Sequence, residues 1–221
     1  MPISKTSNFG NPYIGLFARS SDRLAAVDIS ASPKFLHALC ALEVPVVKAT
    51  FGGSGFAGIF LAMNSNGAVL PSFCSREEIA LFKSHGLNVA TVSAEVSAAG
   101  NNIAANDFGA IANPDVPRGK LKEISDCLGV EVHPMMVAGY ATVGSAVLAT
   151  NKGFVAHNRA SEEELKQLHS IFRVEGVNST LCTGTAFVSL CALANSKSAL
   201  FGESCTGFEM GRAVDALAIL Q

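Results

Sequence analysis

Short runs of alternating apolar and polar residues recur along the chain, in pairs that flank a polar turn. In one copy, Ile59, Leu61 and Met63 precede the turn, and Ala68 and Leu70 follow it. Alternation is typical of a half-buried strand, and two such runs around an Asn- and Gly-containing turn predict a β-hairpin. The corresponding turns contain Asn64, Asn106, Asn151 and Asn195, which lie 42, 45 and 44 residues apart. A spacing of this length predicts a structural repeat.

A helical pattern follows each hairpin. Three of the five predicted helices begin with Ser or Thr followed three residues later by Glu, which is the signature of a capping box. The other two begin at a polar residue with a proline in the first turn, where proline is favoured. The predicted caps are Ser32, Ser75, Asp115, Ser161 and Thr206. Apolar residues at helical spacing, such as Leu121, Ile124 and Leu128, give each helix one face to bury.

The repeating unit is therefore two strands, a helix and a third strand. Four helices are followed by a β-rich run such as LEVPVVKAT (42–50), whereas few residues follow the fifth. Each unit has a face that it cannot bury alone, and a closed ring of units buries these faces and leaves no free sheet edge. We predict a single α/β domain over residues 1–221, with five ββαβ-like repeats at roughly 1–43, 44–86, 87–129, 130–173 and 174–221.

Composition and charge restrict the class of partner. Hydrophobic residues make up 49% of the chain and charged residues 15%, which is enough for a sizeable core and too apolar for intrinsic disorder. The 16 basic and 18 acidic residues give no strong positive field to hold phosphates. We therefore expect no DNA partner, and any contact with RNA has to rely on shape or on an accompanying protein.

The chain carries no sign of secretion or membrane insertion. Its N-terminal sequence lacks the apolar core of a signal peptide, and the longest apolar stretches, 56–63 and 143–149, are too short to span a bilayer. We expect a soluble, cytoplasmic protein. The cysteines form no C-x-x-C pair and are expected to be small buried residues in a reducing compartment. They are Cys40, Cys74, Cys127, Cys182, Cys191 and Cys205.

Two short motifs resemble functional signatures. GSGFAG (53–58) matches the dinucleotide-binding pattern, but the sequence after it predicts a strand and not the helix that would hold a pyrophosphate. Close backbone packing where strands meet is the favoured interpretation of these glycines. GESCT resembles a nucleophile elbow around Ser204, but Thr206 replaces the last glycine. We interpret Ser204 as an ordinary surface residue.

The histidines do not complete a catalytic or metal-binding set. A cysteine hydrolase needs a nearby His and an orienting acid. We expect His37, His85 and His169 to be exposed on helices or their ends, His133 to lie in a loop without an orienting acid, and His157 to end a strand. No spacing matches a metal-ligand set. We predict no catalytic residue, no metal and no cofactor, and hence no enzyme.

Five segments, one from each unit, resemble a known family. They are GNPYIGLFAR, GGSGFAGIFLAMNSNGAVLP, SAAGNNIAANDFGAIANPD, VGSAVLATNKGFVAH and GFEMGRAVDAL. Together they span most of the chain and resemble the translation initiation factor 6 family, with an ending similar to that of archaeal members. The resemblance implies the pentein fold, in which five ββαβ-like units surround a pseudo-fivefold axis. This agrees with the repeat count.

The resemblance also implies a function in protein biosynthesis. The family binds the large ribosomal subunit at its intersubunit face, against the large-subunit protein numbered fourteen and near the sarcin–ricin loop. As a bound monomer, it keeps the small subunit from joining. A role in large-subunit biogenesis remains open. The alternative is an enzyme, because pentein folds also include guanidino-modifying hydrolases and transferases that use a cysteine nucleophile in the central channel.

The expected ribosome-binding face lies at the starts of the inner hairpin strands. In a ring of units, these equivalent positions gather on one side, where long apolar residues stand beside glycines. Such a surface suits a protein partner better than phosphate. The resemblance places the face at Tyr13, Ile14, Gly15, Gly58, Ile59, Asn101, Asn102, Ser145, Ala146, Thr185 and Phe187.

Overall fold

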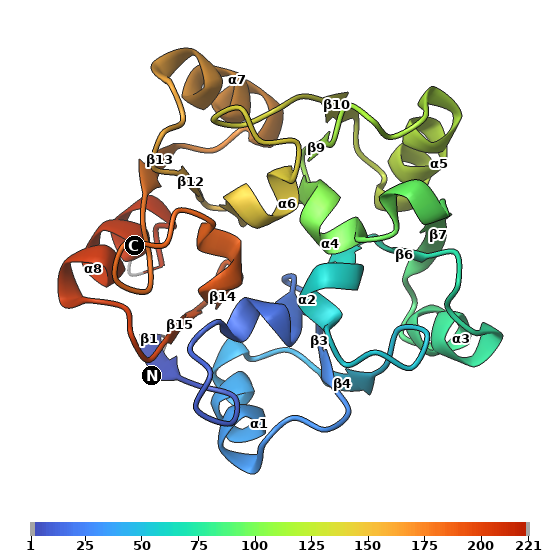
Figure 1. The fold of residues 1–221 in the computed structure, drawn as a ribbon, viewed down its shortest axis with the longest axis horizontal. Helices are drawn as coiled ribbons and strands as arrows, with labels where there is room; N and C mark the ends of the chain where they lie inside the picture. The colour runs from blue at the N-terminus through green and yellow to red at the C-terminus, as the bar shows by residue number, and fades with distance from the viewer. Residues whose placement is uncertain (1–2, 220–221) are drawn as a thin grey trace.

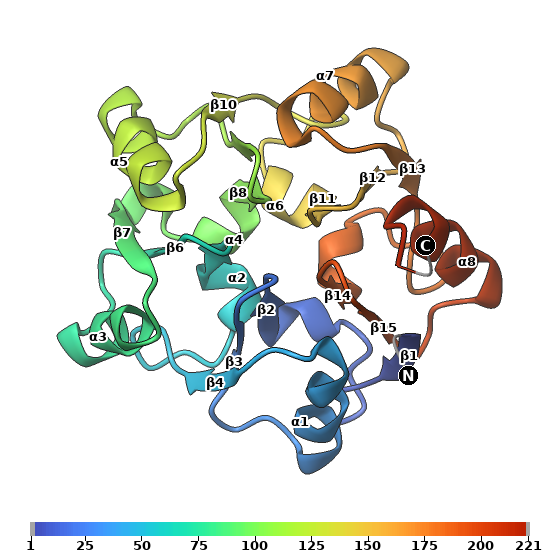
Figure 2. The same ribbon diagram turned by 180° about the vertical axis from the view of Figure 1, so that it is seen from behind.

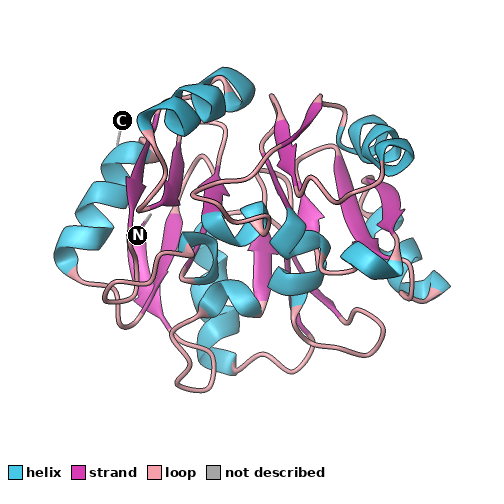
Figure 3. Ribbon diagram, turned by 45° about the horizontal axis from the view of Figure 1, so that its top comes forward, coloured by secondary structure: helices cyan, strands magenta, loops and turns pink. Residues whose placement is uncertain are grey.

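The computed structural model describes residues 3–219. In this range, five three-stranded sheets surround one axis, with a longer helix at the outer edge of each unit (Figure 1; Figure 3). The sheets are β2 (Ala18–Ser20), β3 (Ala25–Asp28) and β4 (Val46–Ala49); β5 (Ala62–Met63), β6 (Gly67–Pro71) and β7 (Asn88–Val92); β8 (Ile103–Ala105), β9 (Ala110–Ala112) and β10 (Val132–Pro134); β11 (Val147–Ala149), β12 (Phe154–His157) and β13 (Gly176–Ser179); and β14 (Ala192–Ala194), β15 (Ala199–Gly202) and β1 (Ile3–Thr6).

Every sheet has the same topology. The middle strand pairs antiparallel with the inner strand before it and parallel with the outer strand that follows the helix. The outer helices are α1 (Pro33–Leu39), α3 (Arg76–Ser84), α5 (Arg118–Leu128), α7 (Glu162–Phe172) and α8 (Gly207–Ala216). The predicted α/β ring of five ββαβ-like units is therefore confirmed.

The N-terminal strand completes the last sheet. β1 pairs parallel with β15, from Ile3 opposite Ala199 to Thr6 opposite Gly202. The inner strands β2, β5, β8, β11 and β14 each contact the next, and β14 contacts β2, so the ring is continuous (Figure 2). The predicted repeat limits divide the sequence between each helix and its third strand, so the stretch 1–43 contributes strands to two sheets.

Neighbouring units share their cores. The apolar cluster around Phe51 and Phe82 combines Leu24 and Val47 of the first sheet with Leu70 of the second. The other four clusters likewise draw residues from two adjacent units, including the fifth and the first. Stacking therefore buries the faces that no unit covers alone, which is the physical basis of a repeat fold.

Four of the five predicted helix caps are confirmed. The hydroxyls of Ser75, Ser161 and Thr206 complete capping boxes, and Ser32 accepts a hydrogen bond from the backbone of Phe35 at 3.2 Å. The predicted cap Asp115 is wrong. The side chain of Asn113 holds the backbone N–H of Asp115 in a turn at 2.8 Å, and α5 begins after Pro117 without a side-chain cap. A competing Asx turn two residues earlier displaces the helix start.

In every hairpin turn, a side-chain oxygen accepts hydrogen bonds from the backbone. In some turns, the residue that does so differs from the predicted one. Asn64, Asn106 and Asn195 each accept hydrogen bonds from the backbone N–H groups two and three residues later. In the remaining units, the hydroxyls of Thr150 and Ser21 accept these bonds. The predicted Asn151 is therefore one residue too late, because a hydroxyl oxygen can replace the amide oxygen in this turn.

Candidate functional site

The ring of five sheets is called the wheel below. Five one-turn helices precede the inner strands and surround the axis at one end of this wheel. They are η1 (Ile14–Leu16), α2 (Ala57–Phe60), α4 (Ala99–Asn102), α6 (Val143–Ala146) and η4 (Val188–Leu190). Each contacts the next, and η4 contacts η1; α2, α4 and α6 stand near the centre of Figure 1. We call this set the helix ring. The prediction that a strand directly follows Gly58 is wrong, because residues 57–60 are helical and β5 is only two residues long.

Four glycines make the helix ring possible. A Cβ atom added at Gly58 would lie 1.5 Å from the carbonyl oxygen of Gly15, and one at Gly100 would lie 2.2 Å from that of Gly58. A Cβ atom added at Gly144 would likewise lie 2.2 Å from the carbonyl oxygen of Gly100. Real side chains do not tolerate these distances, so each turn is packed backbone against backbone. Gly58 in GSGFAG thus serves close packing, as predicted, but between short helices and not between strands.

A partly buried arginine lies inside the helix ring. Arg19 of β2 donates hydrogen bonds to the carbonyl oxygens of Gly58 at 2.6 Å, Gly100 at 2.8 Å and Leu61 at 3.3 Å. It also donates to the hydroxyl of Ser189. Burial lowers the pKa of Arg19 to about 10, so the guanidinium stays charged at neutral pH. One cation thereby links the first unit to the second, third and fifth.

The residues predicted for the binding face divide into two groups. Tyr13 is exposed, whereas Ile59, Asn101, Thr185 and Phe187 are partly exposed. The others are buried within the helix ring: Ile14, Gly15, Gly58, Asn102, Ser145 and Ala146. Ser145 still contributes indirectly, because its hydroxyl donates to the side-chain oxygen of Asn101 at 2.8 Å and orients that amide. The structure thus brings these residues to one end, where only the first group presents side chains to solvent.

Exposed apolar side chains missed by the sequence analysis surround the helix ring. Phe9, Phe56, Met136 and Tyr140 are exposed and lie in the loops that follow the third strand of a sheet. Because the third strand runs parallel to the middle strand, these loops emerge at the same end as the helix ring. In the described residues, four such loops are closed by a β-bridge, for example Phe51 to Ser54. The signal available in the sequence is an aromatic residue beside the glycines that begin each loop.

An aromatic cluster lies beneath one part of this end. The ring of Tyr140 is 5.0 Å from that of Phe187 and 5.1 Å from that of His157. The backbone N–H of Arg159 donates to Nδ1 of His157 at 3.1 Å. Burial, with a smaller contribution from Arg159, lowers the pKa of His157, so its neutral form is favoured. As predicted, His157 ends a strand, and its ring supports the partly exposed Phe187.

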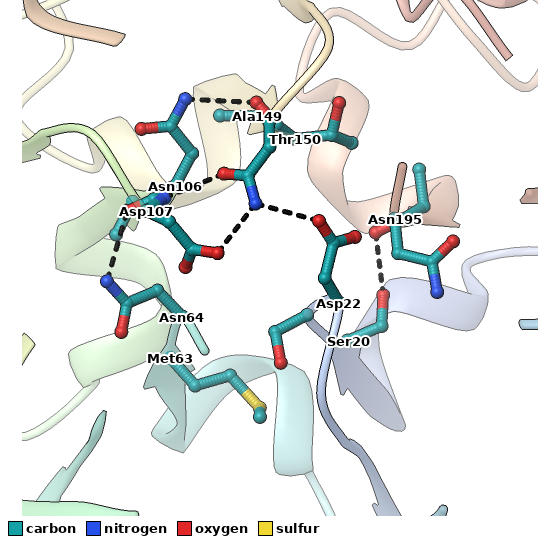
Figure 4. Close-up of a pocket in the computed structure, with 13 residues that line it drawn as sticks. Ser20, Asp22, Met63, Asn64, Asn106, Asp107, Ala149, Thr150 and Asn195 are labelled. Atoms are coloured by element: carbon teal, nitrogen blue, oxygen red, sulfur yellow. Dashed lines mark hydrogen bonds between the residues drawn. The ribbon is translucent and has the colours of Figure 1, made fainter. Parts of the chain in front are cut away.

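The opposite end of the axis is formed by the hairpin turns and is polar. The carboxylates of Asp22 and Asp107 face the axis, and the Asn151 side-chain N–H₂ group donates to both, at 2.7 and 2.6 Å (Figure 4). The backbone N–H groups of Ser65 and Ser196 donate to these same carboxylates at 2.8 and 2.6 Å. Every one of these hydrogen bonds joins two different units. This end therefore holds the turns together.

The remaining sequence candidates lie away from the axis. His37, His85 and His169 are exposed on helices or at their ends, as predicted. His133 lies in β10 and not in a loop, because it pairs with Ile111 of β9. The cysteines are buried as expected except Cys40, which is exposed after α1. Ser204 lies in the turn before α8.

Residues 3–219 can be searched for metal-binding groups and for membrane-spanning helices. No group of three or more His, Cys, Asp or Glu side chains in this range is placed to hold a metal ion. No helix in the same range combines the length and apolar character needed to cross a membrane.

A wheel of five ββαβ units with an inner helix ring defines a pentein-like protein. A profile of the eIF-6 family matches residues 3–216. The chain belongs to the eIF-6 family, and its relatives are named as translation initiation factors. The chain is similar to translation initiation factor 6 of Pyrococcus abyssi, at 34% identity over the full length of both chains. It is also similar to the factors of Thermoplasma acidophilum (34%, covering 98% of this chain and all of the other) and Methanosphaerula palustris (35%, covering 96% of each).

Proposed function

We propose that this protein acts in translation initiation by binding the large ribosomal subunit through its helix-ring end and keeping the small subunit from joining. It acts as a monomer in the cytoplasm and without catalysis. The partner surface is the intersubunit face of the large subunit, at the protein numbered fourteen and near the sarcin–ricin loop. Membership of the eIF-6 family over nearly the whole chain supports the role in initiation.

We choose the helix-ring end because a set of exposed apolar side chains lies there. Tyr13, Phe56 and Tyr140 are exposed there around a backbone-packed ring that has no room to deform. Aromatic residues on a rigid support are typical anchors of protein–protein interfaces. A formal net charge of −2 argues against binding through phosphates alone. A protein component of the large subunit is therefore the fitting primary contact.

Blocking association requires occupancy and no chemical step. A chain of 221 residues has a radius of gyration of about 17 Å. A body of that size, held at a close intersubunit surface, occupies space that the small subunit needs. A stable contact of this kind buries roughly 800 Å² on each partner.

A sucrose-gradient experiment tests this function. Purified large and small subunits from Thermoplasma acidophilum are mixed with and without the protein. We expect the protein to migrate with the large subunit and to reduce the reassociated peak. An unchanged reassociated peak at saturating protein would contradict the proposed function.

Matched variants test the face. Phe56 and Phe108 are 43% and 42% exposed but lie at opposite ends of the wheel. We expect Phe56→Asp and Asn101→Arg to weaken large-subunit binding at least about tenfold, since a charge at a contact costs 1.4 kcal/mol or more. Phe108→Asp should bind like wild type, and all three should unfold at nearly the wild-type temperature. If both helix-ring variants co-sediment like wild type, the assigned face is wrong.

The alternative of a guanidino-modifying enzyme needs Cys, His and carboxylate side chains together in the central channel. Among the described residues, the two cavities along the axis are lined by Arg19, Asp22, Asp107, four asparagines and otherwise small or apolar residues, without Cys or His. This composition favours the binding role. An assay for ammonia or a citrulline-type product from arginine or agmatine separates the two functions.

A further inference from the structure

Three cysteines of the fifth unit approach one another outside the central channel. Cys182 lies in the loop after β13, Cys191 follows η4, and Cys205 lies between β15 and α8. The Sγ atoms of Cys182 and Cys205 are 3.5 Å apart, and the backbone N–H of Cys182 donates to Sγ of Cys205 at 3.2 Å. Neither the proposed function nor the core packing of this unit requires two thiols in contact.

We propose that Cys182 and Cys205 form a redox-active pair that closes to an intramolecular disulfide when the protein meets a hydroperoxide. Cys182 loses its proton, and the thiolate attacks the peroxide oxygen. The O–O bond breaks, Cys182 becomes a sulfenic acid, and the departing alkoxide or hydroxide takes up the lost proton and leaves as alcohol or water. Sγ of Cys205 then attacks the sulfenyl sulfur, the S–O bond breaks, and the departing hydroxide takes the Cys205 proton to form water. In total, two thiols lose two electrons and two protons, and one peroxide is reduced.

The surroundings assign different roles to the two sulfurs. Hydrogen bonding within the cysteine trio lowers the pKa of Cys182 and raises the pKa values of Cys191 and Cys205. Cys182 is thus the thiol that attacks first, because the thiolate is the reactive form. The backbone N–H of Cys182 points at Sγ of Cys205 and stabilises negative charge there during the second step.

A disulfide between Cys182 and Cys205 requires only a short movement of the loop that carries Cys182. The two sulfurs must approach from 3.5 Å to about 2.0 Å. Cys182 and Thr183 both have left-handed backbone angles, with φ of 48° and 58°, which non-glycine residues rarely adopt. Cys182 itself is 4% exposed, but the next two residues, Thr183 and Gly184, are exposed, so the sulfur lies directly beneath the surface of the loop.

Cys191 is the competing partner, and its position argues against it. It is fully buried where η4 passes into β14, inside the continuous ring of inner strands. A shift of Cys191 toward Cys182 would move that strand, whereas a shift of Cys182 moves only a surface loop. The proposal therefore commits to the pair Cys182 and Cys205. It does not depend on the proposed ribosomal function.

Peptide mapping of the folded protein tests the pair. Fully reduced protein carrying Cys40→Ser, which removes the exposed thiol, is treated with hydrogen peroxide. Free thiols are then blocked with N-ethylmaleimide in denaturant, and the non-reduced digest is analysed by mass spectrometry. We expect the Cys182–Cys205 linkage to exceed every other intramolecular linkage by at least about tenfold, because more distant sulfurs cannot meet disulfide geometry. Dithiothreitol should reverse it.

Single substitutions in the same background assign the roles. Cys191→Ser should retain the linkage, whereas Cys205→Ser should leave Cys182 as a sulfenic acid that dimedone traps. Circular dichroism checks that each variant is folded, and the linkage map itself needs only the substitution of the exposed Cys40. A dominant Cys182–Cys191 linkage would overturn the proposal. The proposal would also be overturned if the folded chain formed the Cys182–Cys205 linkage with no greater preference than the same chain oxidised in denaturant.

Discussion

At the scale of single residues, Arg19 differs most from what its sequence context indicates. It lies between Ala18 and Ser20 in the three-residue strand β2, where no local pattern indicates a bonding role. The structure instead surrounds it with three carbonyl oxygens and one hydroxyl from other units. These partners lie between 39 and 170 residues away along the chain, beyond the reach of any local pattern.

Replacing Arg19 should destabilise the ring strongly. Arg19→Met removes four hydrogen bonds from a charged donor and leaves carbonyl groups without their partner, so we expect the free energy of unfolding to fall by about 3 kcal/mol. The control is Arg212→Met. Arg212 is exposed on α8 and also donates to a carbonyl oxygen, that of Asn178, and its loss should cost less than about 0.5 kcal/mol. Denaturant unfolding measures both variants, and equal losses would contradict the linking role of Arg19.

At the scale of elements, the outer helices follow their sequence closely and the helix ring does not. A capping box joins groups three residues apart, so Ser75 with Glu78 and Thr206 with Glu209 could be identified from the sequence alone. The one-turn helices are too short to be stable by themselves. In four of the five, a glycine lets one turn rest on the carbonyl group of the turn before it.

Two glycine substitutions separate these cases. A Cβ atom at Gly100 would lie 2.2 Å from the carbonyl oxygen of Gly58, so Gly100→Ala should lower the free energy of unfolding by about 3 kcal/mol. Gly211, within α8, has no atom within 4 Å of an added Cβ, so Gly211→Ala should raise it by up to about 1 kcal/mol. Thermal and denaturant unfolding measure both effects. A Gly100→Ala protein as stable as wild type would mean that the helix ring is not tightly packed.

At the scale of the whole molecule, closure depends on the chain's first strand. β1 supplies the outer strand of the fifth sheet, and Nζ of Lys5 donates to the carbonyl oxygen of Cys205 at 2.5 Å. Without β1, the edge of β15 carries unpaired backbone groups, which favour pairing with another chain.

Removal of residues 1–6 should therefore both destabilise the protein and make it associate. We expect a lower unfolding temperature by calorimetry and a concentration-dependent dimer by analytical ultracentrifugation, formed by pairing between the exposed β15 edges of two chains. A synthetic peptide of residues 1–10 should reverse both effects, whereas a peptide with the same residues in scrambled order should not. A truncated protein that stays monomeric and unfolds like wild type would show that closure contributes little.

The sequence by itself determined the repeat, its ββαβ order, the hairpins and most helix starts. These features depend on apolar periodicity and on hydrogen bonds between residues only two to four positions apart. Where such local signals compete, as at Asp115, or where another residue type makes the same bond, as at Thr150, the prediction missed by one or a few residues.

The tertiary structure alone decided the helix ring, the position of Arg19, the contact of Cys182 with Cys205, and which residues of the predicted face reach solvent. Ile14 and Ile59 have the same side chain, yet Ile14 is buried and Ile59 is partly exposed. The physical reason is that each of these outcomes depends on backbone from distant units meeting at one axis. Burial and approach distance there are properties of the closed ring and not of any segment.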